Sequence, residues 1–290
     1  MLPSLLRSIR PTQWVKNFVV FAGLVFSQRF VYVDDVLHSL GAFAVFCALA
    51  SAVYLFNDIR DRENDRTHPV KRERPIASGA LPVGTASTAA VILAVVGLVG
   101  AWRLGTLFLA AAGVYLVLNL AYSAFLKRVA IVDVMIIALG FVLRAAAGAA
   151  AIDVVISPWL IVCTTLLALF LGLGKRRGEL LALKEDAADH RAALARYSPY
   201  LLDQFIAVTT ASTVVAYALY TLSAETQAKF GTDQLIWTLP FVLFGVFRYL
   251  YLIHGEGKGG NPTAAFLTDP PLLIDVLLWL AAVLVIISRT

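Results

Sequence analysis

Runs of apolar residues, each close to the length that crosses a bilayer, recur along this chain of 290 residues. A membrane-spanning helix needs about 20 mostly apolar residues. Nine stretches approach or meet that length, namely residues 18–33, 36–56, 85–102, 104–125, 129–152, 154–173, 201–222, 235–253 and 271–287. The first is the weakest, because Gln28 and Arg29 interrupt it. We therefore expect an all-α, polytopic membrane helix bundle of about nine transmembrane helices.

The composition favours this class over the alternatives. Hydrophobic residues make up 60% of the chain and charged residues 15%, and the charges cluster between the apolar runs. The runs are continuous, whereas the strands of a membrane barrel alternate apolar and polar positions. The formal net charge is +5, and the basic residues lie beside apolar segments. We therefore expect a lipid bilayer and anionic substrates as partners, and no nucleic acid. Cys47 and Cys163 lie inside apolar runs, which predicts neither a disulfide nor thiolate ligation of a metal.

The distribution of Lys and Arg predicts the orientation of the chain. If the N-terminus is cytosolic, the even-numbered loops are cytosolic too, and they hold most of the basic residues. This asymmetry follows the positive-inside rule and supports an odd number of helices. Two cytosolic loops, at about 57–84 and 175–199, are long and highly charged. We expect one integral membrane domain, 1–290, in the inner (plasma) membrane, with its chemistry facing the cytosol.

Four oxygen-bearing side chains follow the second apolar run. Asn57, Asp58, Asp61 and Asp65 fit the pattern N-D-x-x-D-x-x-x-D, whose offsets place the carboxylates on one face of a helix. Such carboxylates repel one another unless a cation lies among them, and Mg²⁺ favours one or two carboxylates together with substrate phosphate oxygens. The pattern therefore predicts a Mg²⁺-dependent diphosphate site at a helix end. The competing interpretation is a solvated helix end whose aspartates pair with nearby arginines.

A basic run follows this acidic motif. Lys71 and Arg74 are suited to hold phosphate oxygens that a metal ion does not reach. The alternative is that both residues only anchor the cytosolic side of the chain at the membrane.

Residues 57–65, followed by Lys71 and by 74–79, resemble the UbiA superfamily of intramembrane prenyltransferases. The resemblance implies a nine-helix bundle with two Asp-rich motifs facing a central cavity that opens to the cytosolic face. The first motif matches closely, and the second is absent. Where the family has spaced aspartates after the sixth helix, this chain has a basic triplet and one glutamate: Lys175, Arg176, Arg177 and Glu179.

A basic segment in place of the second Asp-rich motif suits a donor that carries an additional phosphate group. Within the superfamily, the chain resembles the decaprenyl-phosphate phosphoribosyltransferases, over nearly its whole length. Besides the acidic motif, the matching features are residues 10–17, Tyr122 with Ser123 and Lys127, Asp133, Arg144, and residues 175–180. The resemblance implies Mg²⁺-dependent transfer of 5-phosphoribose from 5-phosphoribosyl 1-diphosphate to a polyprenyl (decaprenyl) phosphate, with release of diphosphate.

That reaction gives each candidate a role toward the donor. The leaving diphosphate would be bound by Mg²⁺ on Asp58 and Asp61, with Asp65 as a third ligand. Asn57 would orient the donor or a metal-bound water. Lys71 and Arg74 would hold the remaining diphosphate oxygens, and the donor's 5-phosphate would lie against Lys175, Arg176 and Arg177, beside Glu179.

The acceptor is already an anion, so the reaction needs no general base. We expect its phosphate to be bound by Lys16, Lys127 and Arg144. An arginine inside a membrane span is costly unless it faces a cavity or a partner, so Arg144 is functional by default. Asp133 lies eleven residues before it, about 16 Å along a helix, which is too far for direct pairing. Tyr122 and Ser123 would donate hydrogen bonds to ribose or phosphate, or Tyr122 lies in the interfacial aromatic belt.

Two other functions fit parts of the sequence. A UbiA-type prenyltransferase, which joins a prenyl diphosphate to an aromatic acceptor, shares the fold and the first Asp-rich motif. The absence of the second Asp-rich motif counts against this function. A transporter accommodates intramembrane charges, yet transporter sites lie near the bilayer midplane, whereas these charges gather at one face. A homo-oligomer is also possible, because the small residues of 145–151 permit close helix packing within or between chains.

Overall fold

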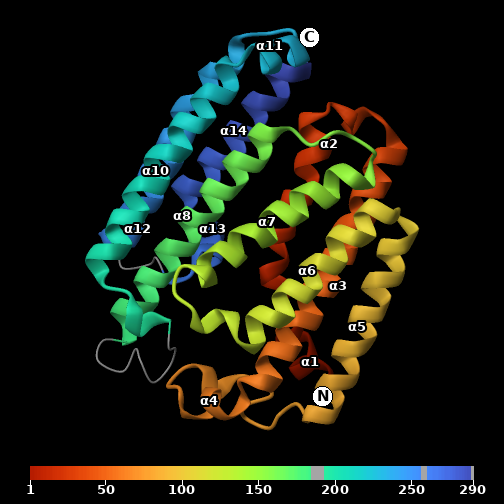
Figure 1. Cartoon of the computed structure of the whole chain (residues 1–290), viewed down its shortest axis with the longest axis vertical. Coiled ribbons are helices and arrows are strands. Elements are labelled where there is room, and N and C mark those ends of the chain that lie inside the picture. Colours follow the sequence, from red (N-terminus) through yellow and green to blue (C-terminus); the bar gives the residue numbers. More distant parts are fainter. Residues whose placement is uncertain (184–192, 256–259, 289–290) are drawn as a thin grey trace. The chain divides into compact units, whose positions relative to one another are not determined.

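Helices are the only regular elements in the parts of the chain that the computed structural model describes, which are residues 1–183, 193–255 and 260–288 (Figure 1). The predicted all-α class is confirmed. The chain forms two compact units. The first comprises Met1–Ile156, and the second comprises the described residues from Ser157 onward apart from Ala193.

The first unit holds four long helices and several short ones. Its elements are α1 (Leu2–Ile9), η1 (Pro11–Phe21), α2 (Ala22–Phe26), η2 (Arg29–Val31), α3 (Val33–Arg60), α4 (Arg62–Thr67), η3 (Lys71–Glu73), α5 (Val83–Arg103), α6 (Thr106–Ala124), η4 (Leu126–Arg128) and α7 (Val132–Ala151). Helix α3 packs against α5 and α6, and α6 packs against α7 (Figure 1).

The second unit is built in the same way from four long helices. Its elements are α8 (Pro158–Leu183), η6 (Leu194–Arg196), α10 (Pro199–Leu222), α11 (Ala224–Phe230), η7 (Gln234–Thr238), α12 (Leu239–His254), α13 (Pro262–Thr268) and α14 (Pro270–Ser288). Helix α8 packs along α10, and α12 packs along α14. Some buried polar side chains of this unit are satisfied by hydrogen bonds between helices, which an apolar surrounding favours. Tyr217 on α10, for example, bonds Thr238 at 2.6 Å and accepts from Trp279 of α14 at 2.9 Å.

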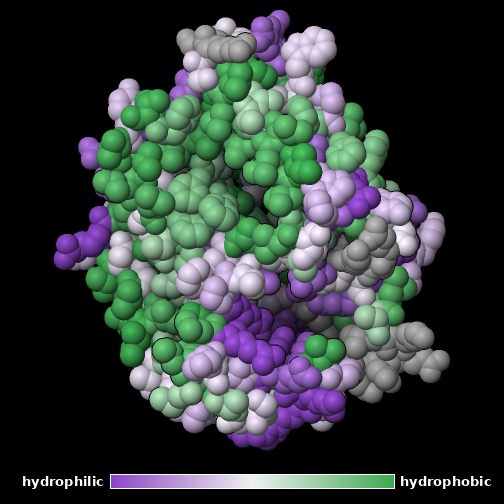
Figure 2. Space-filling model, turned by 180° about the vertical axis from the view of Figure 1, so that it is seen from behind, coloured by the Kyte–Doolittle hydropathy of each residue, from purple (hydrophilic) through white to green (hydrophobic). Residues whose placement is uncertain are grey.

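Eight of the nine expected spans correspond to helices that are long and apolar enough to cross a membrane, counted over the described residues. They are α3, α5, α6 and α7 in the first unit, and α8, α10, η7 with α12, and α14 in the second. The chain is thus a multi-pass membrane protein. Side chains on α5 illustrate the lipid-facing surface, because Val91, Val95 and Val99 are all more than half exposed. Figure 2 shows hydrophobic residues over much of one face, with hydrophilic residues gathered toward one end of it.

The first expected span, 18–33, is the exception, because it is not one helix. It begins inside the 3₁₀ helix η1, continues through the five residues of α2, and breaks at Gln28, whose φ of 59° is left-handed. Residues 27–29 are polar, and Gln28 and Arg29 interrupt the apolar run at this point, which explains the break. The count of nine spanning helices is therefore not confirmed, and the central cavity stays a prediction.

Small residues let the N-terminal segment approach α7 at backbone distance. A Cβ on Gly148 would lie 1.9 Å from the carbonyl oxygen of Val20, and a Cβ on Gly23 would lie 2.9 Å from the Cα of Ala149. The stretch 145–151, expected to allow close packing, does so here within one chain. Around this contact the buried core includes Phe46 and Phe108, and it fixes η1 to α7.

Candidate functional site

The acidic motif lies where α3 ends and α4 begins. Asn57 and Asp58 belong to the last turn of α3, Asp61 lies between the two helices, and Asp65 is on α4. The expectation that the motif lies on one helix is therefore wrong, because α3 ends at Arg60 and α4 begins at Arg62. Backbone hydrogen bonds on both sides, from Asp61 to Asn57 and from Asp65 to Asp61, nevertheless keep the three carboxylates together at this end of the unit.

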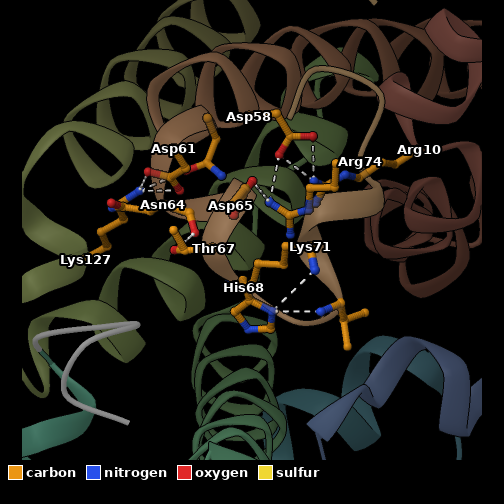
Figure 3. A network of polar contacts seen from close by, with 12 residues as sticks. Arg10, Asp58, Asp61, Asn64, Asp65, Thr67, His68, Lys71, Arg74 and Lys127 are labelled. Carbon is orange, nitrogen blue, oxygen red and sulfur yellow. Dashed lines mark hydrogen bonds and ion pairs between the residues drawn. The ribbon is translucent and has the colours of Figure 1, made fainter. Parts of the chain in front are cut away.

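Asp58 is 2% exposed and is held by two arginines (Figure 3). Nη2 of Arg10 donates to both of its oxygens, at 2.6 and 2.8 Å, and Nη1 of Arg74 donates at 3.0 Å. Arg10 ends α1 with a φ of 54°, a left-handed conformation that costs a non-glycine residue about 1–2 kcal/mol. Its guanidinium also lies 5.1 Å from the centre of the Tyr54 ring. A strained backbone and one nitrogen shared between both oxygens of a buried carboxylate make Arg10 a candidate site residue.

Arg74 joins two aspartates through one nitrogen. Its Nη1 lies 3.0 Å from Asp58 and 2.7 Å from Asp65, so carboxyl oxygens of these two residues converge on one positive charge. The segment after Arg74 is anchored by Ile76 and Leu81, each 1% exposed, which pack in one cluster with Leu55 of α3. Apolar burial thus fixes the arginine over the end of α3.

Burial raises the pKa of Asp65 above its ordinary value, although the charges of Arg74 and Lys71 act in the opposite direction. Lys71 itself begins η3, and its backbone N–H donates to Nδ1 of His68 at 3.3 Å (Figure 3). Both members of the basic run, Lys71 and Arg74, therefore lie beside the acidic motif, as the sequence predicts.

Asp61 has a cation of its own. Nζ of Lys127 on η4 lies 2.5 and 2.7 Å from its two oxygens (Figure 3). The same nitrogen lies 3.3 Å from Oδ1 of Asn57. A hydrogen bond of 3.0 Å from Arg60 to the carbonyl of Ala124 ties the ends of α3 and α6, which brings η4 to the motif. Tyr122 and Ser123 lie on the last turn of the same α6, and Ser123 is buried.

Arg144 is 6% exposed inside α7, and its partners are neutral. It donates to Oδ1 of Asn17 at 2.8 Å, to the carbonyl of Gly140 at 3.0 Å and to the hydroxyl of Tyr115 at 2.8 Å. As the helix spacing predicts, it does not pair with Asp133, which is fully buried in the first turn of α7. Among the described residues, the hydrogen-bond partners of Arg144 therefore include no acidic group.

Lys16 shares this positive region. Burial, together with the charges of Arg144 and Arg10, lowers the pKa of Lys16 to about 8. Its neighbour Asn17 is the residue that accepts from Arg144. Lys16 and Arg144 therefore influence one another, whereas Lys127, the third residue expected at the acceptor phosphate, is bound to Asp61.

The basic triplet lies in the second unit, on the extension of α8 to Leu183, and residues 184–192 of the predicted loop lie outside the described ranges. Its cations are paired. Glu179 binds Arg176 at 2.5 Å and Lys175 at 3.6 Å, and Arg177 binds Asp203 of α10 at 2.5 Å. Arg176 is fully buried, so its role includes holding this helix end together. Lys175 is the most exposed cation of the three.

Several of these partners carried no sequence signal of their own. Arg10 and Asn17 belong to the segment 10–17 that carries part of the resemblance, but no spacing pattern connects them to their partners. Tyr115 and Asp203 lie within or next to apolar runs and fit no motif. Their roles follow from packing between elements that are far apart in sequence.

Known proteins resemble this chain over most of its length. Residues 17–268 match the UbiA prenyltransferase family. The chain is 34% identical to the decaprenyl-phosphate phosphoribosyltransferase of Mycolicibacterium smegmatis, over 98% of this chain and 92% of that protein. It is 35% identical to the protein of the same name from Mycobacterium tuberculosis, over 98% and 94%. The solved structure of a UbiA homolog from Archaeoglobus fulgidus bound to GPP and Mg²⁺ superposes with a TM-score of 0.74 at 20% identity, covering 98% of this chain and 99% of that one.

Proposed function

This chain belongs to the UbiA prenyltransferase family, and we propose that it transfers 5-phosphoribose from 5-phosphoribosyl 1-diphosphate to a polyprenyl phosphate such as decaprenyl phosphate. The observation that carries the proposal is the likeness, over nearly the whole chain, to relatives that are named for this reaction. The paired basic and acidic groups at the end of α3 suit a diphosphate donor, and a basic second segment suits its further phosphate. The reaction would take place at the cytosolic side of the plasma membrane.

The carboxylate oxygens at the end of α3 fit a magnesium ion. Over the described residues no three His, Cys, Asp or Glu side chains converge as a complete metal cage. Mg²⁺ does not need one, because it usually takes one or two carboxylates and completes its octahedron with phosphate oxygens and water. Asp58 and Asp65 already converge on a single cationic nitrogen of Arg74, so their oxygens are placed to share a positive charge. We assign these two as ligands, with Asp61 as the third candidate.

The bond changes are those of a single displacement. A phosphate oxygen of the lipid attacks C1 of the ribose, the bond from C1 to the diphosphate oxygen breaks, and diphosphate leaves with that electron pair. When bound, Mg²⁺ would neutralise the negative charge that develops on the leaving diphosphate. The chain's own residues bind and orient the reactants: Arg74, Lys71 and Lys127 at the diphosphate, Lys16 and Arg144 at the lipid phosphate, and Lys175, Arg176 and Arg177 at the 5-phosphate.

Acceptor binding is expected to weaken above pH 8. Lys16 with a pKa of about 8 is a cation below that pH and a neutral amine above it, and only the cation attracts phosphate strongly. If only protonated Lys16 binds, the apparent KM for polyprenyl phosphate rises about 10-fold between pH 7 and pH 9. Lys16→Arg keeps its charge and is expected to remove most of this rise. The same pH profile in wild type and Lys16→Arg would exclude Lys16 as its source.

Lys175→Ala is expected to raise the KM for 5-phosphoribosyl 1-diphosphate about 10-fold or more, the worth of one charge-assisted hydrogen bond, and to change the KM for the lipid less than 2-fold. Lys175 is the variant of choice, since Arg176 is fully buried and its loss would disturb the fold. Lys229→Ala, on α11 of the same unit, removes the same charge away from α8 and serves as the matched control. Equal effects of Lys175→Ala on both substrates would remove Lys175 from the 5-phosphate site.

The decisive test of the reaction uses membranes that contain the full chain. Labelled 5-phosphoribosyl 1-diphosphate and a polyprenyl phosphate should yield a labelled lipid, and EDTA should abolish it. Activity instead with a prenyl diphosphate and an aromatic acid, without labelled lipid, would show a prenyltransferase. Uptake that persists in EDTA, again without labelled lipid, would show a transporter.

A further inference from the structure

Three carboxylates and three cations at the end of α3 form a closed set of ion pairs (Figure 3). Arg10 holds Asp58, Arg74 bridges Asp58 and Asp65, and Lys127 holds Asp61. All six belong to the first unit. The side chains are 2–26% exposed, so the pairs are largely withdrawn from water. The formal charges of this cluster, which we term the counter-ion cluster, cancel.

A neutral cluster disfavours the binding of either ion by itself. A lone divalent cation has to take oxygens from Asp58, Asp61 or Asp65, and it would leave arginine or lysine partly buried without a partner. A lone diphosphate has to draw those cations away and would leave the carboxylates unpaired. Removing one partner from a buried pair is strongly unfavourable, because the remaining charge loses both its partner and its hydration. When both ions arrive together, each takes the partners that the other releases.

We propose that Arg10, Arg74 and Lys127 are exchangeable counter-ions, which pair with the three aspartates as the structure shows and turn to diphosphate oxygens when the aspartates take up a divalent cation. The proposal rests on the proposed function for the nature of the two ligands. It adds Arg10 to the diphosphate-binding residues. It also means that divalent cation and diphosphate bind as a coupled pair, so that the free metal does not occupy the site.

The strained N-terminal turn supports the role of Arg10. Its φ of 54° directs a residue of the α1–η1 junction onto Asp58, and the face of the Tyr54 ring supports the guanidinium. Planar arginine forks bind carboxylate and phosphate with the same geometry, so one guanidinium can exchange one partner for the other. Lys127 offers the simplest test, because its removal frees Asp61 alone among the carboxylates.

The experiment measures binding of Mn²⁺ and of pyrophosphate to the purified full-length protein in nanodiscs, by the EPR signal of free Mn²⁺ and by calorimetry. Protein-free titrations correct for the complex that the two ions form in solution. In the wild type, pyrophosphate should tighten Mn²⁺ binding at least about 5-fold, and Mn²⁺ should tighten pyrophosphate binding by the same factor, as linkage requires. Independent affinities would overturn the proposal.

Variants of Lys127 and Arg10 should change the two affinities in opposite directions. Lys127→Gln should tighten Mn²⁺ binding measured without pyrophosphate at least about 3-fold, since it removes a repelling charge and frees Asp61, and it should weaken pyrophosphate binding. Arg10→Gln should act with the same signs through Asp58, which gives a second answer if one variant folds poorly. Arg128→Gln, the exposed neighbour of Lys127 on η4, should change neither.

The outcome is separate from that of the transfer assay. If Lys127→Gln and Arg10→Gln both weaken Mn²⁺ binding as well as pyrophosphate binding, the cations only support the structure, and the proposal is wrong even if phosphoribose is transferred. If coupled binding and the opposite effects are found in a protein that transfers no phosphoribose, the proposed function fails and the exchange of counter-ions stands.

Discussion

Asp61→Asn is expected to lower turnover by at least about 10²-fold while the protein stays folded, the scale seen when one preorganised charge-stabilising group is lost. The asparagine keeps the shape of the side chain and removes the charge that Lys127 contacts at 2.5 and 2.7 Å. The amide oxygen of the asparagine still accepts from Lys127, which also keeps Oδ1 of Asn57, so the ammonium group retains hydrogen-bond partners and little stability should be lost. Asp58 is less suitable, because its removal would leave Arg10 without its buried carboxylate and Arg74 with Asp65 alone.

Glu63→Gln provides the matched control for Asp61→Asn. Glu63 lies on α4, two residues away, its side chain is 73% exposed, and it pairs with Arg66 outside the counter-ion cluster. The charge change is the same, and we expect turnover within 2-fold of wild type. Turnover by the labelled-lipid assay and melting in detergent should be compared for all three proteins. Wild-type turnover in Asp61→Asn would remove Asp61 from the site, and equal losses in both variants would indicate a general effect of local charge.

The membrane helices could be predicted from the sequence because bilayer thickness sets both their length and their polarity. Eight of nine apolar runs are helices of the described residues, and α3, which corresponds to the second run, extends from Val33 to Arg60 where residues 36–56 were expected. Helix α8 continues to Leu183, through charged residues that follow the apolar run ending at 173. A helix need not end at the edge of the bilayer's hydrocarbon core. Its backbone hydrogen bonds form equally well where the side chains are charged.

For the acidic motif, the sequence pattern predicts the residues that are close together in the chain, but not their distant partners. The sequence identified its residues and placed a basic run beside them, and the structure brings Asp58 and Asp65 to Arg74. The other partners lie 48 and 66 positions away, at Arg10 and Lys127. No spacing rule connects such positions. Their pairing depends on the packing of α1 and η4 against the end of α3, which only the tertiary structure supplies.

The basic triplet was harder to interpret, since side-chain type alone does not distinguish a free cation from a paired one. Lys175 and Arg176 share Glu179, a residue three or four positions away that a helical pattern does place beside them. The partner of Arg177 is Asp203 on another helix, which the sequence could not indicate. Burial of Arg176 likewise depends on packing within the fold.

The largest loss of stability is expected from Gly148→Ala. A Cβ at this position would lie 1.9 Å from the carbonyl oxygen of Val20, and a backbone atom cannot move aside as a flexible side chain can. Overpacking of a tight core commonly costs about 1–3 kcal/mol, and a clash with backbone should reach the upper end or exceed it. The melting temperature in detergent should fall accordingly. Because η1 also carries Lys16 and Asn17, any folded fraction should show a raised KM for the lipid acceptor.

Gly113→Ala separates this clash from the general effect of adding a methyl group to a membrane helix. Gly113 lies on α6 of the same unit, and a Cβ there would meet no atom within 4 Å. Alanine restricts the unfolded chain more than glycine does, so this variant should melt at or slightly above the wild-type temperature. If Gly148→Ala were as stable as Gly113→Ala, η1 could not lie against α7 at backbone distance. The positive region formed by Lys16 and Arg144 would then lose its structural basis, because the contact between η1 and α7 is what brings Asn17 to Arg144.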